Sequence, residues 1–104
     1  MLQLIKKLLG LGSATDYKTL LQSGATIIDV RSKGEYLGGH IKGSINIPLD
    51  TLNSNLSKLK KDQIIITCCA SGMRSTSAKR ILKSNGYLNV YNGGGWMSLQ
   101  NRIN

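Results

Sequence analysis

A short apolar run that ends in two adjacent cysteines constrains this chain more than any other stretch. Residues 64–67 are all β-branched, which predicts a buried strand. Cys68 and Cys69 follow, and a loop with one glycine leads to apolar positions with helical spacing from Ser75 onward. Such a strand, loop and helix aim backbone N–H groups at one point, where the positive helix end also favours an anion. The stretch therefore predicts a nucleophilic cysteine held among N–H groups.

Cys69 is the expected nucleophile of the pair because it begins the loop, where its thiol should ionise more readily than a free one. The alternative is a structural role, since free cysteine is among the most buried residue types. Successive strand residues point to opposite faces, so Cys68 should turn away from the loop. We expect Cys68 to be structural, with a resolving thiol as the alternative.

Three stretches together resemble the rhodanese (sulfurtransferase) domains, over about residues 15–98. Residues 69–75, Cys-Ala-Ser-Gly-Met-Arg-Ser, resemble the active-site loop of that family. Its first signature is matched by Asp29-Val30-Arg31, Glu35-Tyr36 and residues 39–48, and its C-terminal end by Gly86-Tyr87, residues 90–94 and Trp96. The resemblance implies one rhodanese-like domain over 13–104, after an amphipathic helix or extension over 1–12. The implied fold is three-layer α/β, a mostly parallel sheet of about five short strands with helices on both faces.

The resemblance also implies an activity and assigns roles to the loop. Sulfane sulfur would move from thiosulfate or a persulfide donor, through a Cys69 persulfide, to cyanide or a thiol, with no cofactor. Arg74 would hold the loop or the substrate anion. Backbone N–H groups would come from the rest of the loop, which comprises Ala70, Ser71, Gly72, Met73 and Ser75. Met73 could also shield the sulfur, and Gly72 should adopt a conformation forbidden to other residues.

Supporting residues are expected at the end of an earlier strand. Asp29 and Arg31 should form an ion pair that ties a loop to the sheet, at the strand end where parallel sheets place their sites. His40 lies in a glycine-rich turn, where a hydrogen-bonded structural role is favoured over general-base catalysis. Trp96 is expected to pack against the core.

The remaining pattern alternates helices with short strands, as in α/β folds with parallel sheets. Helices are expected over 16–22, 33–37, 49–60 and 75–84, strands over 25–30, 44–47 and 88–91, flexible backbone over 92–95 and a last turn over 96–99.

Composition narrows the function classes. Two adjacent cysteines and one histidine offer neither a disulfide scaffold nor a metal site. No apolar run approaches the ~20 residues that span a bilayer, so we expect no stable membrane association.

The formal charge of +9 favours a small anion such as thiosulfate, or a protein sulfur donor or acceptor. Nucleic acid is not expected, because aromatics are only 5% and the cations form no long block. A cytoplasmic monomer is expected, with the periplasm as the alternative compartment.

Two other functions compete with the sulfurtransferase hypothesis. Resemblance to phosphatases and arsenate reductases of related fold would imply one more residue in the loop, whereas only four separate Cys69 from Arg74. A sulfur-carrier or protein-docking module would use the basic surface instead.

Overall fold

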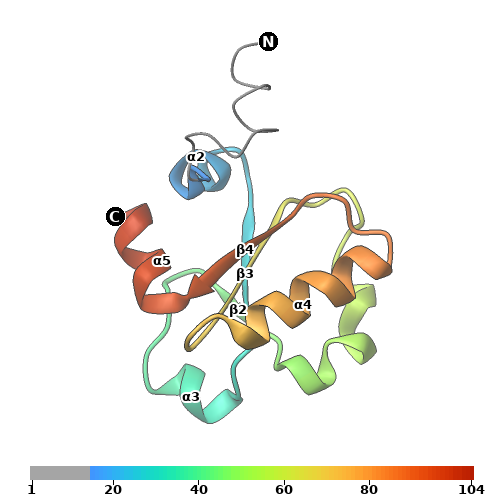
Figure 1. The fold of residues 1–104 in the computed structure, drawn as a ribbon, viewed down its shortest axis with the longest axis horizontal. Coiled ribbons are helices and arrows are strands. Elements are labelled where there is room, and N and C mark those ends of the chain that lie inside the picture. The colour runs from blue at the N-terminus through green and yellow to red at the C-terminus, as the bar shows by residue number, and fades with distance from the viewer. Residues whose placement is uncertain (1–14) are drawn as a thin grey trace.

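The computed structural model describes residues 15–104, so the helix predicted over 1–12 lies outside the described residues. A parallel sheet with strand order β2-β1-β3-β4 forms the centre (Figure 1). Its strands are β1 (Thr26–Asp29), β2 (Ile45–Asn46), β3 (Ile65–Cys69) and β4 (Val90–Gly95). The α-helices are α2 (Tyr17–Gln22), α3 (Lys33–Leu37), α4 (Met73–Ser84) and α5 (Trp96–Ile103), and two 3₁₀ helices are η1 (Leu49–Thr51) and η2 (Asn53–Lys58).

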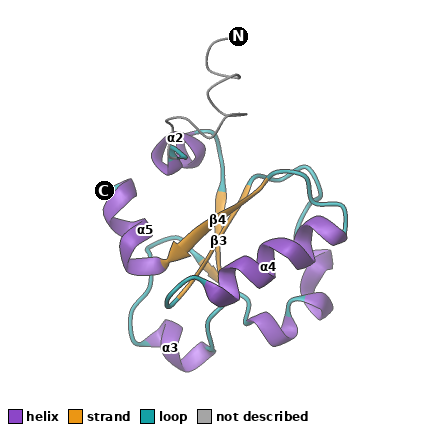
Figure 2. Ribbon diagram, viewed as in Figure 1, coloured by secondary structure: helices purple, strands orange, loops and turns teal. Residues whose placement is uncertain are grey.

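Two hydrophobic clusters cover the two faces of this sheet. Helix α4 and the η1–η2 region pack on one face, where Leu52, Ala78 and Leu82 are fully buried. Helices α2 and α5 cover the other face, where Tyr17 and Leu99 are buried (Figure 2). The three-layer α/β architecture predicted from the sequence is therefore confirmed. None of the helices within residues 15–104 has the length and apolar character to cross a membrane.

The sheet differs from the prediction in having four strands among the described residues rather than about five. The central strands β1 and β3 are buried on both faces, as their continuous apolar sequences predict. The chain between β2 and β3 forms the 3₁₀ helices η1 and η2.

The prediction of a single amphipathic helix over 49–60 is wrong, because this segment forms η1 and η2. Its leucine spacing does place Leu52 and Leu59 in the core. Polar side chains compete for the backbone, however: Thr51 Oγ1 donates to Pro48 O at 2.9 Å, and Asn55 Nδ2 donates to Thr51 O at 2.8 Å. Serine and asparagine have low helix propensity for this reason, which favours short turns here.

The prediction of flexible backbone over 92–95 is also wrong, because these residues belong to β4. Glycine is required there by close backbone approach rather than by mobility. A Cβ on Gly93 would lie 2.7 Å from Thr67 O and 2.8 Å from Leu99 Cδ2, and one on Gly95 would lie 2.8 Å from Ala70 O. The last helix is also longer than predicted, since α5 continues to Ile103.

Gly93→Ala should lower the free energy of unfolding by about 1–3 kcal/mol, because the new methyl group has no space between β3 and α5. Chemical denaturation monitored by circular dichroism measures this change. Gly34→Ala is the matched control, since a Cβ there meets nothing within 4 Å and alanine suits the interior of α3. Equal stability of the two variants would contradict the close approach of β4 to β3.

Candidate active site

The Cys69 sulfur lies at the end of β3 and accepts two backbone hydrogen bonds. Gly72 N–H donates at 2.9 Å and Ser75 N–H donates at 3.3 Å. Gly72 is the N-cap of α4 and has no side chain to accept from the first turn, so Cys69 Sγ performs that role. Because N–H donors and the positive helix end both face the sulfur, the site favours negative charge there.

The loop owes its shape to Gly72, whose φ of +115° is a left-handed conformation that other residues rarely adopt. The expectation for Gly72 is therefore confirmed. Helix α4 begins at Met73, two residues before the predicted start, so Met73 and Arg74 add first-turn N–H groups without intrahelical acceptors. Ala70 and Ser71 are exposed at the turn.

Met73 does not shield the sulfur as predicted, because its side chain is 81% exposed. Cys69 itself is 1% exposed and packs in the same cluster as Val30 and Ala78. The sulfur is therefore shielded by the buried cluster beneath α4 in which Cys69 packs.

Cys68 faces the opposite layer of the fold. It packs with Ile66 and Leu99 beneath α5, while Cys69 packs beneath α4. Burial and the nearby Asp29 carboxylate raise the pKa of the Cys68 thiol to about 12, so this thiol is protonated at neutral pH. Both cysteines are free.

A buried polar cluster fixes the first turn of α4 to the sheet. Thr67 Oγ1 lies 2.7 Å from Ser75 Oγ, and Ser75 Oγ donates to Asn92 Oδ1 at 2.6 Å. Asn92 Nδ2 in turn donates to Thr76 Oγ1 at 2.8 Å. Sequence reasoning missed Thr67 and Asn92, although a threonine within a buried apolar strand signals a polar partner, because buried hydroxyls are nearly always hydrogen-bonded.

Arg74 joins the loop to α3. Its Nη1 and Nη2 donate to Glu35 Oε1 and Oε2 at 2.7 and 3.0 Å. Glu35 also accepts from Ser32 N–H at 3.0 Å, within a capping box at the start of α3. The Arg74 guanidinium and the Ser32 donors lower the pKa of Glu35 to about 2. The position of Glu35, three residues after Ser32, is the sequence signal for this capping box.

Asp29 and Arg31 form the expected buried ion pair, with Arg31 Nη2 2.7 Å from Asp29 Oδ2. Arg31 Nη2 also donates to Gly39 O at 2.7 Å, and its guanidinium lies 4.7 Å from the centre of the Trp96 ring. His40 stacks on Tyr36 and its Nδ1 lies 2.7 Å from Tyr36 O. These contacts hold the loop after β1 against the sheet and α5.

Within residues 15–104, no group of three or more His, Cys, Asp or Glu side chains is arranged to hold a metal ion.

Comparison with known proteins identifies the family. The Rhodanese-like domain model matches residues 13–102. This chain belongs to the rhodanese-like domain family. Thiosulfate sulfurtransferase PspE of Escherichia coli strain K12 is 37% identical over 70 residues, which cover 65% of this chain and 67% of that protein. The putative sulfur carrier protein YrkF of Bacillus subtilis strain 168 is 38% identical over 66 residues, covering 64% and 36%.

The solved structures agree with this assignment. A human single-domain sulfurtransferase superposes with a TM-score of 0.74 at 30% identity, covering 84% of this chain and 95% of that one. The matched stretches span 28% to 67% of the length of four curated relatives.

Glu35→Gln should destabilise the protein in a pH-dependent way, because glutamine keeps an acceptor for the capping box but loses the charge that pairs with Arg74. The pKa of Glu35 falls on folding from an ordinary value of 4.5 to about 2, so its contribution is complete above pH 4.5. That contribution should shrink as the pH falls from 4.5 to 2. Urea unfolding of both proteins across this range measures the difference.

The same substitution in an Arg74→Gln background is the control, since the partner charge is then already absent. A stability difference that stays constant down to pH 2, or that is unchanged without Arg74, would contradict a role for this ion pair.

Proposed function

We propose that this chain is a sulfurtransferase that moves sulfane sulfur from thiosulfate or a persulfide donor to cyanide or a thiol through a persulfide on Cys69. The observation that carries the proposal is the pair of N–H donors, from Gly72 and Ser75, on the Cys69 sulfur. A structural thiol needs no such donors, whereas a thiolate is stabilised by them.

In the first half-reaction, the Cys69 thiolate attacks the outer sulfur of thiosulfate. The sulfur–sulfur bond of thiosulfate breaks, and sulfite leaves with the bonding electron pair. Negative charge then lies on the outer sulfur of the Cys69 persulfide. The first-turn N–H groups of α4 that have no intrahelical acceptor can stabilise that charge.

In the second half-reaction, a nucleophilic acceptor attacks the outer sulfur of the persulfide. Cyanide leaves as thiocyanate, or a thiolate leaves as a persulfide, and the Cys69 thiolate is restored. In each step one sulfur–sulfur bond breaks and another bond to sulfur forms. Cys69 is therefore the reactive group that the chain must supply.

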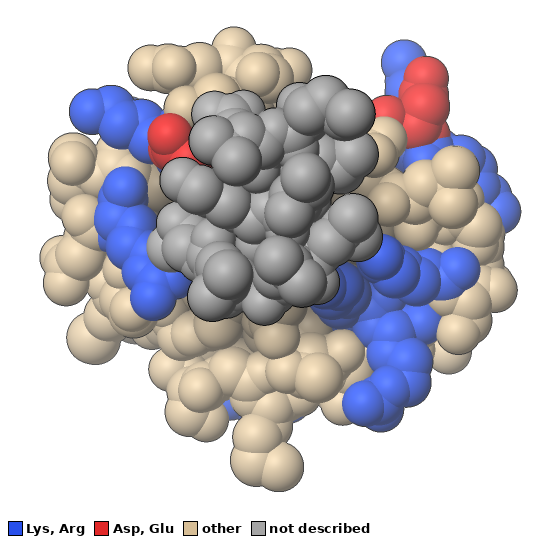
Figure 3. All heavy atoms as spheres, turned by 45° about the horizontal axis from the view of Figure 1, so that its top comes forward, with Lys and Arg blue, Asp and Glu red and all other residues tan. Residues whose placement is uncertain are grey.

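The charge of the molecule suits an anionic donor. The chain carries 14 Lys and Arg against 5 Asp and Glu, and Lys and Arg outnumber acids on the face drawn in Figure 3. A positive field raises the encounter rate with thiosulfate. Because the nucleophile must stay reduced, we propose the cytoplasm as the compartment.

Phosphatase chemistry is the less favoured enzyme function. Four residues separate Cys69 from Arg74, which is one fewer than phosphatase loops require. Both terminal guanidinium nitrogens of Arg74 are also engaged by Glu35, so they do not surround an oxyanion at the loop. A sulfur carrier remains the second candidate, because the relative YrkF bears that description and a carrier would use the same Cys69 persulfide.

Incubation with thiosulfate should add one sulfur atom to the protein, and cyanide should remove it with release of thiocyanate. Intact-mass spectrometry before and after each reagent measures both half-reactions. Loading by a persulfidated protein but not by thiosulfate would favour the carrier. Hydrolysis of an aryl phosphate without persulfide formation would overturn the proposal.

Cys69→Ser should abolish sulfur loading, because a serine hydroxyl cannot form a persulfide. It should leave the fold intact, because serine still fits the loop. Cys68→Ser should keep sulfur transfer, since Cys68 faces α5, and should lose about 1–3 kcal/mol from burial of a hydroxyl. Thiosulfate loading and thermal unfolding of both variants separate these effects. Loss of loading in Cys68→Ser with retention in Cys69→Ser would assign the nucleophile to Cys68.

A further inference from the structure

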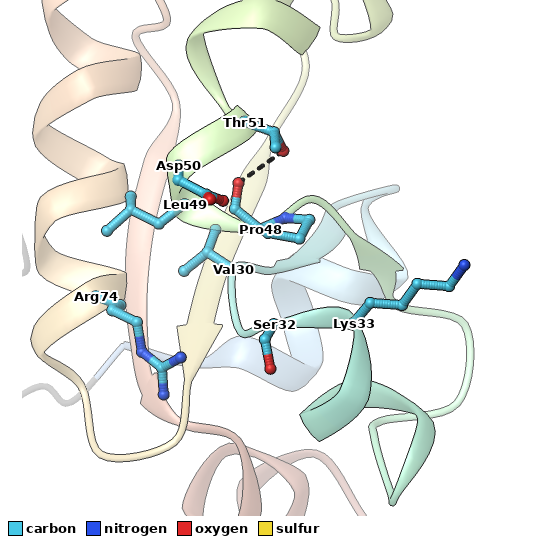
Figure 4. Close-up of a pocket in the computed structure, with 8 residues that line it drawn as sticks. All are labelled: Val30, Ser32, Lys33, Pro48, Leu49, Asp50, Thr51 and Arg74. Atoms are coloured by element: carbon cyan, nitrogen blue, oxygen red, sulfur yellow. Dashed lines mark hydrogen bonds between the residues drawn. The ribbon is translucent and has the colours of Figure 1, made fainter.

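A cleft of about 600 Å³ borders the candidate active-site loop at the carboxyl ends of β1 and β2 (Figure 4). It is lined by the chain after β1, by the η1 segment and by Arg74. Because Arg74 belongs to the candidate active-site loop, this cleft is part of the site described above. A different hollow lies along α4 and has no role in the proposed sulfur chemistry.

This hollow encloses about 400 Å³ on the side of α4 that faces away from the core. Asn92 of β4 stands at one end, where its Nδ2 donates to Thr76 Oγ1 at 2.8 Å. Spacings of three and four residues place the other lining residues on one side of the helix, opposite the buried Ala78 and Leu82. These residues, which form the basic face of α4, are Thr76, Lys79, Arg80, Lys83 and Ser84.

The three cations of the basic face have no acidic partners. Among residues 15–104, none of Lys79, Arg80 and Lys83 forms an ion pair. The sequence explains this, because residues 63–104 contain no Asp or Glu. The helix dipole accounts for Lys83 in the last turn of α4, but its effect does not extend to the other two cations. The basic face therefore presents charges that a partner can neutralise.

An exposed methionine extends this surface toward the candidate active-site loop. Met73 lies three residues before Thr76 and seven before Arg80, which places it on the same side of α4. Its apolar side chain is 81% exposed, and methionine adapts to varied apolar partners. At 1.5 Å per residue, the surface from Met73 to Lys83 is about 15 Å long, which matches about five residues of an extended chain.

The strength of exposed charge pairs favours a macromolecular ligand over a small anion. One exposed pair changes an affinity by about two- to fivefold, so three pairs contribute about a hundredfold at most. A small anion would therefore bind weakly, whereas a protein adds apolar contacts such as those that Met73 offers. Nucleic acid fits less well, because single strands bind by stacking on aromatic side chains and no aromatic residue of the described chain lines the hollow.

We propose that the basic face and Met73 dock an acidic segment of a partner protein. Carboxylates of the segment pair with the three cations, and an apolar side chain of the segment packs on Met73. Ser75 belongs to the same helix turn as Met73, and its N–H donates to the Cys69 sulfur, so the docked segment ends beside the candidate active site. The inference goes beyond the proposed sulfurtransferase function, because this surface can bind whether or not sulfur moves.

The probe is a peptide of four glutamates and two leucines that is blocked at both ends, and its control has glutamine in place of each glutamate. Both are titrated into isotope-labelled protein at low salt, and amide chemical shifts report the site and the dissociation constant. The acidic peptide should shift the amides of α4, and added salt should weaken its binding. Equal binding of the glutamine peptide, shifts confined to other elements, or no binding at millimolar peptide would overturn the proposal.

Substitution of the cations tests the charge pairs one by one. Lys79→Gln, Arg80→Gln and Lys83→Gln should each weaken binding about two- to fivefold, and the triple variant about ten- to a hundredfold. Glutamine is a good helix former, so α4 should persist in all of them. Lys18→Gln is the matched control, because Lys18 is exposed on α2, which covers the opposite face of the sheet. Unchanged binding in the triple variant, or an equal loss in Lys18→Gln, would overturn the assignment.

The apolar contact has its own test. Met73→Ser should weaken binding of the leucine-containing peptide about four- to fifteenfold, the effect of burying one or two methylene groups. Binding of a peptide with serine in place of each leucine should not change. Met97→Ser is the matched control, since Met97 is an exposed methionine on α5. An equal effect on both peptides, or the same loss in Met97→Ser, would overturn the contact with Met73.

Other polyanions are tested with a single-stranded thymidylate dodecamer and with phosphatidylglycerol vesicles. Tighter binding of either one than of the acidic peptide, lost in the triple variant, would overturn the assignment of a protein partner. The titration needs no sulfur loading, so Cys69→Ser should bind the acidic peptide as the unaltered protein does. Failure of thiosulfate to load Cys69 therefore leaves the docking surface supported, and failure of the peptide to bind leaves the sulfurtransferase proposal intact.

Discussion

The hydrogen bonds from Gly72 and Ser75 to the Cys69 sulfur organise this molecule, because they join the central strand to the helix that follows it. The sulfur takes the place of the side chain that usually caps a helix, so the start of α4 and the candidate nucleophile depend on each other. Both donors are backbone N–H groups, so no side-chain rearrangement is needed to place them on the sulfur.

Two sets of contacts hold the loop from opposite sides. The Thr67, Ser75 and Asn92 side chains connect the first turn of α4 to β3 and β4. The Arg74–Glu35 pair connects the same turn to α3 and borders the cleft. Glycines at the end of β4 let its backbone approach the loop more closely than any side chain would permit. The loop is thus held by contacts from several strands and helices.

The sequence determined the architecture and the candidate active-site segment by itself. Apolar β-branched runs separated by helical patterns predict parallel β/α units, and the order of strand, glycine loop and helix places a cysteine at a helix start. Alternation along a strand also separates the two cysteines, which lie in different hydrophobic clusters. These features follow from local periodicity and from one glycine, so a single sequence suffices to predict them.

Tertiary structure alone decided which long-range contacts form. Packing against β3 makes strand rather than flexible backbone of the Gly93–Gly95 segment. Arg74 and Glu35 are 39 residues apart, and Ser75 and Asn92 are 17 apart, so no local spacing reveals either contact. The cleft is formed by three chain segments that meet only in the folded sheet. Local propensity records what each segment prefers, whereas these features depend on which segments the parallel sheet brings together.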